Sequence, residues 1–356
     1  MKLLFGNILV TGGLGFIGSH FIRRILSKES ISGSIINIDF MGYGSNLNNL
    51  QGNAGTRYRH LNSNINNKKA LEELAKTTKI NMIINFAAET HVDRSISNPT
   101  EFIDSNVDGV VSLLEFCRLH DVQLFIQIST DEVYGDATGR KPFDECSPLT
   151  PNSPYSASKA AADLLTRAYN KTYGLKTIIT RCSNNFGPNQ FPEKLIPKTI
   201  IRALKGLPIP IYGDGSQIRE WIYVDDHVDA ILKVIAKGKL GEIYNITSSH
   251  EMSNIDVITN IRDILQSNTV GINVRIKHVG DRPAHDRRYS LSSSKIKKDL
   301  GWRPSFSFNV ALEQTVKWYI NNEWWWAPLL KDRVLDYQPW KIDWKGKRLK
   351  LEEKKS

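Results

Sequence analysis

Two adjacent acidic residues, Asp131 and Glu132, directly follow an apolar run that is typical of a β-strand. Residues 124–128 read Leu-Phe-Ile-Gln-Ile, and aromatic and β-branched residues of this kind favour strands. In open α/β sheets, ligands bind at the carboxyl ends of the strands. Two carboxyl groups there can act as one acid and one base if their surroundings separate their pKa values. The alternative is a solvated loop in which Asp131 caps a helix.

A glycine-rich motif lies near the N-terminus, between a predicted strand and a predicted helix. Gly12, Gly15 and Gly18 give a G-x-x-G-x-x-G spacing. The first glycine permits a tight turn, the second lets the backbone approach a pyrophosphate, and the third allows close packing of helix and sheet. The phosphates would lie at the N-terminus of helix 16–26, where free N–H groups attract anions. The strand before and the helix after are the context that this fingerprint requires.

An acidic residue ends the second predicted strand. Asp39 lies 21 residues beyond Gly18, where a carboxylate can bind the hydroxyl groups of a ribose and repel a 2′-phosphate. No arginine stands in the next four residues, Phe-Met-Gly-Tyr. The pattern therefore predicts NAD and not NADP. A structural turn aspartate is the alternative.

The residues Tyr155 and Lys159 form a Tyr-x-x-x-Lys pair. A spacing of four places both on one helix face. Free tyrosine has a pKa of about 10 and is a poor base at neutral pH. A nearby ammonium group and a positive nicotinamide ring favour the phenolate and should lower that pKa. Such a pair is common on ordinary helices, but together with the glycine motif and Asp39 it indicates a short-chain dehydrogenase/reductase.

The elements that must position these residues alternate along the first 180 residues. Strands are predicted over residues 8–11, 35–39, 58–61, 82–86, 124–128 and 177–181, and helices over 16–26, 68–76, 100–120 and 155–173. Such alternation predicts an α/β fold, a Rossmann-type doubly wound parallel sheet with helices on both faces. We expect an NAD-binding domain over 1–185, a smaller mixed α/β substrate-binding lobe over 186–330 whose chain interleaves with the first, and a basic tail over 331–356.

Composition and charge restrict the class of protein further. The net charge is +10, and much of the excess lies in the tail, which we expect to be a solvated terminus and not a nucleic-acid site. Five of the eight tryptophans stand in the last 33 residues, which predicts packing onto the body of the protein or a subunit contact. No run approaches a membrane span, and the first five residues are interpreted as strand and not as a signal peptide. Three scattered cysteines without metal-ligand spacing predict a cytoplasmic protein with no metal site.

The chain resembles the nucleotide-sugar 4,6-dehydratases of the dTDP-glucose type, which are extended short-chain dehydrogenase/reductases. The resemblance runs from about residue 7 to about residue 319. The segments that carry it are 12–18 (GGLGFIG), 86–95 (FAAETHVDRS), 129–135 (STDEVYG), 155–159 (YSASK), 182–188 (CSNNFGP), 191–197 (FPEKLIP) and 281–289 (DRPAHDRRY). The Thr-Asp-Glu triplet is the specific part, because related 4-epimerases usually have small or hydroxyl residues there.

The resemblance implies a role for each catalytic residue. Tyr155, supported by Lys159, takes the proton of the sugar 4-hydroxyl while hydride passes to NAD. The resulting 4-ketone acidifies the C5 proton, which Glu132 removes. Asp131, protonated, donates to the departing C6 hydroxyl, and Thr130 orients the sugar. The product would be a 4-keto-6-deoxy sugar nucleotide plus water, as used in rhamnose-type deoxysugar biosynthesis.

The resemblance also implies which residues bind the two ligands, and it implies a homodimer through helices 100–120 and 155–173. Besides the glycines, the residues expected at NAD are Phe16, Ile17, Asp39, Asn64, Ile65, Ala87, Ser105, Tyr155, Lys159 and Asn185. Those expected at the sugar nucleotide are Thr90, Thr130, Asn184, Lys194, Leu195, Pro210, Tyr212, Arg219, Asn254, Arg282 and His285. The family usually has Gly-Asp-Ile where this chain has Ser63-Asn64-Ile65, so Asn64 would accept a hydrogen bond from adenine without a charge. Surface salt bridges are the alternative role for Arg219 and Arg282.

Two rival functions and the identity of the nucleotide stay open. A 4-epimerase on the same scaffold would not need Asp131 and Glu132. A non-catalytic NAD-binding interaction module would not need the Thr-Asp-Glu triplet or the Tyr-Lys pair. Thymidine and uridine differ by one methyl group, which one pocket contact distinguishes by only about 1–3 kcal/mol.

Overall fold

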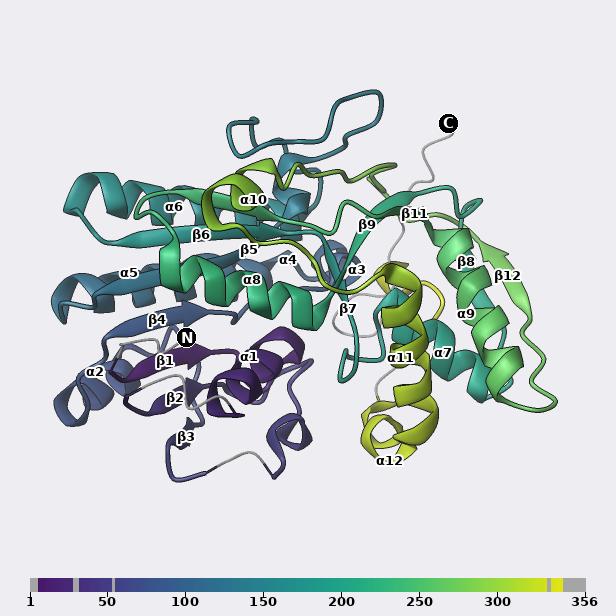
Figure 1. Ribbon diagram of the computed structural model, residues 1–356, viewed down its shortest axis with the longest axis horizontal. Helices are drawn as coiled ribbons and strands as arrows, with labels where there is room; N and C mark the ends of the chain where they lie inside the picture. Colours follow the sequence, from purple (N-terminus) through teal and green to yellow (C-terminus); the bar gives the residue numbers. More distant parts are fainter. Residues whose placement is uncertain (1–5, 28–31, 53–54, 332–333, 342–356) are drawn as a thin grey trace.

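The central element of the fold is a seven-stranded sheet. The computed structural model describes residues 6–27, 32–52, 55–331 and 334–341. The strand order is β10-β6-β5-β4-β1-β2-β3, and every neighbouring pair is parallel (Figure 1). The bounds are β1 Ile8–Thr11, β2 Ile35–Ile38, β3 Tyr58–Leu61, β4 Met82–Asn85, β5 Leu124–Thr130, β6 Thr177–Cys182 and β10 Ile243–Ile246. The predicted Rossmann-type parallel sheet is confirmed.

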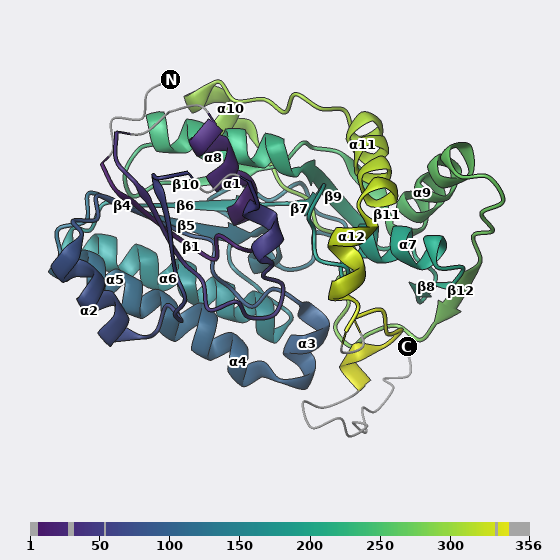
Figure 2. The same ribbon diagram turned by 90° about the horizontal axis from the view of Figure 1, so that it is seen from below.

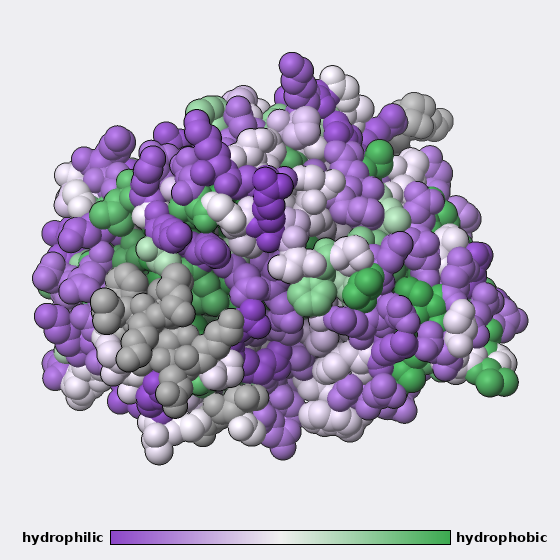
Figure 3. All heavy atoms as spheres, viewed as in Figure 1, coloured by the Kyte–Doolittle hydropathy of each residue, from purple (hydrophilic) through white to green (hydrophobic). Residues whose placement is uncertain are grey.

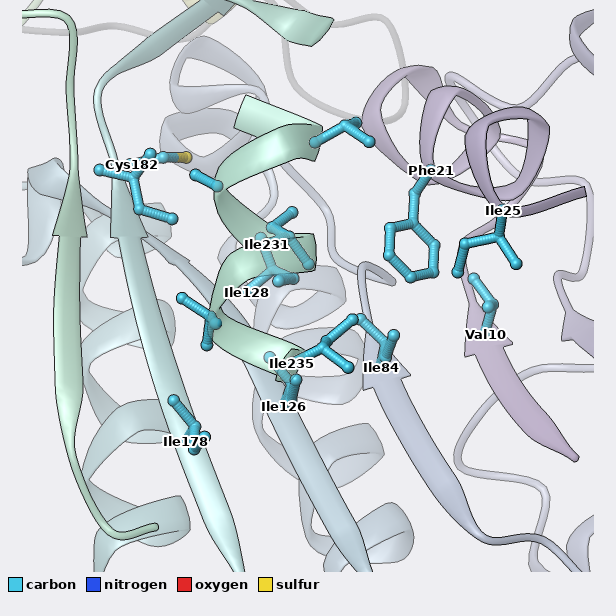
Figure 4. Close-up of a cluster of buried hydrophobic side chains, with 14 of the residues drawn as sticks. Val10, Phe21, Ile25, Ile84, Ile126, Ile128, Ile178, Cys182, Ile231 and Ile235 are labelled. Carbon is cyan, nitrogen blue, oxygen red and sulfur yellow. The ribbon is translucent and has the colours of Figure 1, made fainter. Parts of the chain in front are cut away.

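Helices cover both faces of this sheet, as Figure 2 shows. One face carries α1 (Phe16–Ser27), α8 (Val224–Lys237) and α10 (Ser294–Leu300), and the other carries α2 (Lys68–Thr77), α5 (Gly109–Leu119) and α6 (Pro154–Tyr173). Strands β1, β2, β4, β5, β6 and β10 are buried along their whole length, which explains why they read as continuous apolar runs. Figure 4 shows Phe21 and Ile25 of α1 and Ile231 and Ile235 of α8 packed over the strands.

A second lobe lies beside the carboxyl ends of the strands. It holds a sheet of β7 (Asn184–Phe186), β9 (Ile218–Tyr223) and β11 (Glu251–Ser253), and a parallel pair of β8 (Ile209–Tyr212) and β12 (Ile276–Val279). Helices α7 (Leu195–Leu204), α9 (Asn254–Asn268), α11 (Phe308–Asn321) and α12 (Glu323–Trp326) enclose its own apolar core. The chain enters this lobe after β6, returns to the first for α8 and β10, and returns again for α10. Segments from both lobes therefore meet at the boundary between them.

The predicted helix over residues 100–120 is three consecutive pieces. Helix α4 (Pro99–Ile103) leads through a π-helical turn, Asp104–Asp108, into α5. Within the turn the buried Asn106 accepts from the backbone N–H of Glu89 at 2.8 Å and donates to Ser158 Oγ at 2.9 Å. Turns of this kind are frequent at functional sites, and this one ties α6 to the loop that follows β4.

The C-terminal tryptophans pack onto the body of the protein, one of the two arrangements expected for them. Trp325, Trp326 and Trp340 are buried. Within the predicted tail, residue 331 is exposed and residues 334–341 are buried or half-buried, while residues 332–333 and 342–356 lie outside the described residues. The face in Figure 3 is mostly hydrophilic. No helix in the described part of the chain is long and apolar enough to span a membrane.

A buried ion pair joins the sheet to α6. Arg181 on β6 donates through Nε to Asp163 at 2.8 Å, and both side chains are at most 1% exposed. Arg181 also donates to the hydroxyl group of Tyr134 at 2.7 Å. These contacts fix the end of β6 relative to the segment after β5.

Replacing Asp163 by Ala should lower the free energy of unfolding by about 3–5 kcal/mol, because the guanidinium of Arg181 would remain buried without its partner. Chemical denaturation of the two proteins measures the difference. Glu313→Ala is the control, since it removes the exposed ion pair Glu313–Lys317 and should cost at most about 0.5 kcal/mol. Equal losses of unfolding free energy in the two variants would contradict the stabilising role of the buried ion pair.

Candidate active site

Two adjoining cavities open where the parallel strands end. The first lies over the carboxyl ends of β1, β2, β4, β5 and β6, and the second lies between the loop after β4 and the second lobe. Six residues line both cavities: Thr90, His91, Glu132, Asn184, Glu193 and Lys194. A ligand in one cavity would therefore lie directly beside a ligand in the other.

The glycine motif forms the floor of the first cavity. Gly12 has a φ of +66°, and a Cβ atom there would lie 2.7 Å from the backbone nitrogen of Ala87. At Gly18 a Cβ atom would lie 2.5 Å from the carbonyl oxygen of Gly12. The motif thus allows the close approach of β1, α1 and the loop after β4 that a pyrophosphate site needs.

The Asp39 carboxylate accepts hydrogen bonds from the adjacent turn and can still accept one from a ligand. Its Oδ2 accepts from the backbone N–H of Leu14 at 3.0 Å, and its Oδ1 accepts from the backbone N–H of Met41 and from Ser45 Oγ. A carboxylate offers about four acceptor sites, so at least one remains for a ribose hydroxyl. The structural role and the predicted binding role are therefore compatible. The lining residues that follow Asp39 are uncharged: Phe40, Gly42, Tyr43, Gly44 and Ser45.

The remaining residues predicted at NAD line the first cavity as well. They are Gly15, Phe16, Ile17, Asn64, Ile65, Ala87, Ser105, Tyr155, Lys159 and Asn185. Ser105 reaches it from the π-helical turn.

The two acids follow β5 at the junction of the cavities. Thr130 ends the strand, its hydroxyl oxygen accepts from the backbone N–H of Glu132 at 3.3 Å, and its hydroxyl donates to Asp131 Oδ1 at 3.1 Å. The acids lie in a single 3₁₀ turn, Asp131–Tyr134. Asp131 Oδ2 and Glu132 Oε2 are buried and have no protein hydrogen-bond partner. Buried polar atoms of this kind call for a partner, and a substrate can supply one.

The surroundings of the two acids separate their pKa values. Burial raises the pKa of Asp131 well above its usual range, and the neighbouring Glu132 carboxylate adds to the shift. Burial also raises the pKa of Glu132, but Arg282 and Arg219 oppose that shift. Asp131 is thus the group that holds its proton more tightly, and Glu132 is the group that loses its proton more easily.

Tyr155 and Lys159 occupy one face of α6, as their spacing predicts. The Tyr155 side chain lines the first cavity and interacts with Thr130. In the chain alone, burial raises the pKa of Tyr155 well above 10, and the carboxylate of Glu132 adds to the effect. The Lys159 ammonium donates to the carbonyl oxygen of Ile128 at 2.7 Å, and burial lowers the pKa of this lysine. The surroundings within the chain therefore favour the neutral phenol of Tyr155. The positive charge of the predicted nicotinamide ring would favour the phenolate.

Arg282 and Arg219 lie in the second cavity and are not surface residues. Arg219 is 5% exposed. Arg282 donates to Asp93 Oδ1 at 2.8 Å, with side-chain exposures of 14% and 3%. Their surface salt-bridge alternative is therefore wrong. The other residues predicted at the sugar nucleotide line the same cavity: Thr90, Asn184, Lys194, Leu195, Pro210, Tyr212, Asn254 and His285, while Thr130 lines the first.

Several residues of the site were missed. Glu89, His91 and Glu193 line the cavities, and His91 Nε2 lies 3.4 Å from Glu193 Oε2. Burial lowers the pKa of His91 to about 4 and raises that of Glu89 to about 7. All three stand inside motifs quoted for the resemblance, so a signal was present in the sequence.

His227 is a different case. It is fully buried on α8, its Nδ1 lies 2.8 Å from Asn185 Oδ1, and burial lowers its pKa to about 3. Neutral His227 therefore donates to Asn185 and fixes the amide orientation. No local pattern links residues this far apart in the sequence. No group of side chains in the described residues could hold a metal ion.

The fold and site together define a Rossmann-type dehydrogenase/reductase of the extended short-chain class. Residues 9–315 match the family of GDP-mannose 4,6 dehydratase. A probable dTDP-glucose 4,6-dehydratase of Sinorhizobium fredii is 42% identical over 98% of this chain and 99% of its own length. The chain belongs to the nucleotide-sugar 4,6-dehydratases.

Solved structures give the same result. DesIV, a dTDP-glucose 4,6-dehydratase of Streptomyces venezuelae crystallised with NAD and dTDP, is 43% identical and has a TM-score of 0.86 over 91% of this chain and 99% of its own. A UDP-glucose 4-epimerase of Thermotoga maritima with UDP-glucose has a TM-score of 0.80 at 27% identity, covering 88% of this chain and 99% of its own. Dehydratases and epimerases thus share the fold, and the residues of the site must separate them.

Replacing Gly18 by Ala should abolish the retention of NAD by the purified protein. Alanine is normally favoured over glycine inside a helix, but here its methyl group would push α1 away from the Gly12 carbonyl. The cofactor released on denaturation is measured against protein. Gly55→Ala is the control, because a Cβ atom there meets nothing within 4 Å. Full NAD content in Gly18→Ala would contradict the assignment of the glycine turn.

Proposed function

We propose that this protein dehydrates a nucleoside-diphosphate-glucose to the 4-keto-6-deoxy sugar nucleotide and water with NAD as resident cofactor. It is thus a hydro-lyase of deoxysugar biosynthesis. One observation carries the proposal: a buried acid pair with separated pKa values lies at the junction of two cavities, and Glu132 lines both. Elimination of water from a sugar needs one group that takes a proton and one that gives a proton to the leaving hydroxyl.

The first cavity would hold NAD on the glycine turn, with Asp39 at a ribose, and bound NAD would supply the hydride acceptor and donor of the reaction. Tyr155 would take the proton of the sugar 4-hydroxyl. Its phenol is neutral in the chain alone, so the proton transfer depends on positive charge brought with the cofactor. Lys159, held by the Ile128 carbonyl, would keep its ammonium beneath this position. Thr130, which contacts Asp131 and Tyr155, would orient the sugar between them.

Glu132 would then remove the C5 proton, which the neighbouring 4-ketone has made acidic. Arg282 and Arg219 keep the carboxylate form of Glu132 accessible at neutral pH. Asp131 would give its proton to the C6 hydroxyl, so that the C6–O bond breaks and water leaves. Burial keeps Asp131 protonated until that step. Return of the hydride from the bound cofactor to C6, and of a proton from Glu132 to C5, would give the 4-keto-6-deoxy sugar and restore NAD. General acid and base groups of this kind each contribute about 10²–10⁴ in rate.

The second cavity would bind the nucleoside diphosphate. The forks of Arg219 and Arg282 suit a diphosphate group, and the ring of Tyr212 offers a face for a planar base. The names of the related proteins support dTDP over UDP. An epimerase, the nearest alternative on this fold, has no use for a proton donor and acceptor at C6 and C5, and an idle NAD-binding module would not need the Tyr155–Lys159 pair.

A paired turnover assay with dTDP-glucose and UDP-glucose tests the proposal. The 4-keto-6-deoxy product is read by its absorbance in alkali and by the mass loss of one water. We expect product from dTDP-glucose at the higher rate. Epimerised sugar without loss of water would establish the epimerase instead.

Two isosteric variants separate the proposed roles of the acids. Asp131→Asn should lower dehydration by about 10²–10⁴ and still exchange the C5 proton with deuterated solvent, because Glu132 is intact. Glu132→Gln should lose both dehydration and exchange. Mass spectrometry of the recovered sugar measures the exchange. Normal dehydration by Asp131→Asn, or C5 exchange by Glu132→Gln, would contradict the roles.

We further propose a homodimer through α5 and α6, which lie side by side. Apolar residues that are exposed or half-buried recur every three or four positions on these helices and α4: Ile103, Val107 and Val111, and Ala157, Ala161, Leu164 and Ala168. An apolar stripe of this kind needs a partner. Light scattering should give twice the chain mass of 40.3 kDa, and Leu164→Arg should give a monomer. The control is Leu240→Arg at another exposed leucine, and a monomeric wild type would refute the dimer.

The expected division of the chain also stays a proposal. We propose that residues 1–185 form the NAD-binding domain together with the returning segments α8, β10 and α10, and that the rest of 186–330 forms the substrate lobe. Cys117, Cys146 and Cys182 are free thiols, which supports a cytoplasmic location.

A further inference from the structure

The described end of the chain lies across the boundary between the two lobes. We call residues 334–341 the C-terminal strap. Its last part, the 3₁₀ turn Pro339–Lys341, packs against α3 (Val92–Ser97) of the first lobe. One residue earlier, Gln338 Nε2 donates to the carbonyl oxygen of Gly280 in the second lobe at 3.0 Å. The strap therefore contacts both walls of the second cavity.

Helix α7 anchors the strap through two cationic side chains. Arg202 donates to the carbonyl oxygen of Leu335 at 2.5 Å, and Lys198 Nζ donates to that of Asp336 at 2.6 Å. The guanidinium of Arg202 also lies 4.4 Å from the ring centroid of Tyr337. Lys198 and Arg202 are both buried, and the strap carbonyls add to the acceptors of these cations, since Arg202 Nε also donates to the carbonyl oxygen of Pro208 at 2.6 Å. Lys198 lines the second cavity as well.

Trp340, the second-last residue of the strap, supports the cavity wall. Trp340 is 1% exposed, and its ring meets that of Tyr212 edge to face, with centroids 4.7 Å apart and planes at 80°. The Tyr212 hydroxyl donates to Asp93 Oδ2 at 3.3 Å. The other oxygen of Asp93 accepts from Arg282. A chain of direct contacts thus runs from Trp340 through Tyr212 and Asp93 to Arg282.

We propose that the C-terminal strap sets the geometry of the nucleotide end of the substrate site, with Trp340 as the positioning residue for Tyr212 and, through Asp93, for Arg282. The inference rests on the function proposed above and adds the part of the chain that shapes its nucleotide pocket. Without the indole, the Tyr212 ring is free to turn into the vacated space. That movement would break its bond to Asp93 and loosen the group that holds the Arg282 guanidinium. The contacts of Trp340 and Tyr212 described here lead to Glu132 only through Arg282, so the NAD end of the site would be untouched.

Calorimetric titration of the NAD-loaded protein with dTDP tests the proposal without relying on turnover. Trp340→Ala should raise the Kd for dTDP by about tenfold, or about 1.4 kcal/mol. In turnover, KM for dTDP-glucose should rise similarly, and kcat should fall by a smaller factor because the effect on Glu132 passes only through Arg282. NAD content should stay within about twofold, a difference of only about 0.4 kcal/mol. Trp340→Phe should restore most of the affinity, because it keeps an aromatic ring against Tyr212. Trp324→Ala is the matched control, since Trp324 is 55% exposed, and it should bind dTDP like the wild type.

Gln338→Ala provides a milder variant should Trp340→Ala fail to fold, since it removes only the contact with Gly280. It should also weaken dTDP binding, by a smaller factor, with NAD content unchanged. Wild-type affinity in folded Trp340→Ala, or in Gln338→Ala if Trp340→Ala does not fold, would overturn the role of the strap. So would a loss of kcat and NAD in parallel with affinity, which would indicate a general structural role. A wild type that neither binds dTDP nor turns over would overturn the proposed function and the strap's role together.

Discussion

The site depends on the burial of two carboxyl groups side by side at the end of β5. Removing a carboxylate from water is costly, and two adjacent ones cannot both be ionised there at low cost. The surroundings of the two carboxyl groups differ. Glu132 and Glu220 add to the rise that burial causes in the pKa of Asp131, whereas Arg282 and Arg219 of the second lobe oppose the rise at Glu132. In the proposed mechanism, two chemically similar side chains thus take opposite roles because their surroundings differ.

The interleaving of the chain between the two lobes is related to this asymmetry. Both acids belong to the first lobe. The difference between their pKa values depends on cations of the second lobe. Arg219 lies on β9, and Arg282 follows β12 and is held by Asp93 of the first lobe. Neither lobe alone reproduces the electrostatics of the pair. The link between the lobes is therefore part of the chemistry and not only of the fold.

Features fixed by local geometry could be predicted from the sequence. The glycine turn, Asp39 and the Tyr155–Lys159 pair act over a few residues or one helix face, and buried parallel strands leave continuous apolar runs. Features that depend on distant contacts could not. The π-helical turn forms where Asn106 binds Glu89 and Ser158, and the bond from His227 orients Asn185 across 42 residues. The rise in the Tyr155 pKa caused by burial beside Glu132 depends on such distant contacts, and so does the packing of Trp340 against Tyr212.

The protonation state of Asp131 is the most direct test of this account. Infrared difference spectroscopy of the wild type against Asp131→Asn at neutral pH would isolate the signal of this one side chain. The account predicts that the C=O stretch of a protonated carboxylic acid is lost in the variant. Loss of carboxylate bands instead would show that Asp131 is ionised in the resting protein, and the division of roles between the two acids would be wrong.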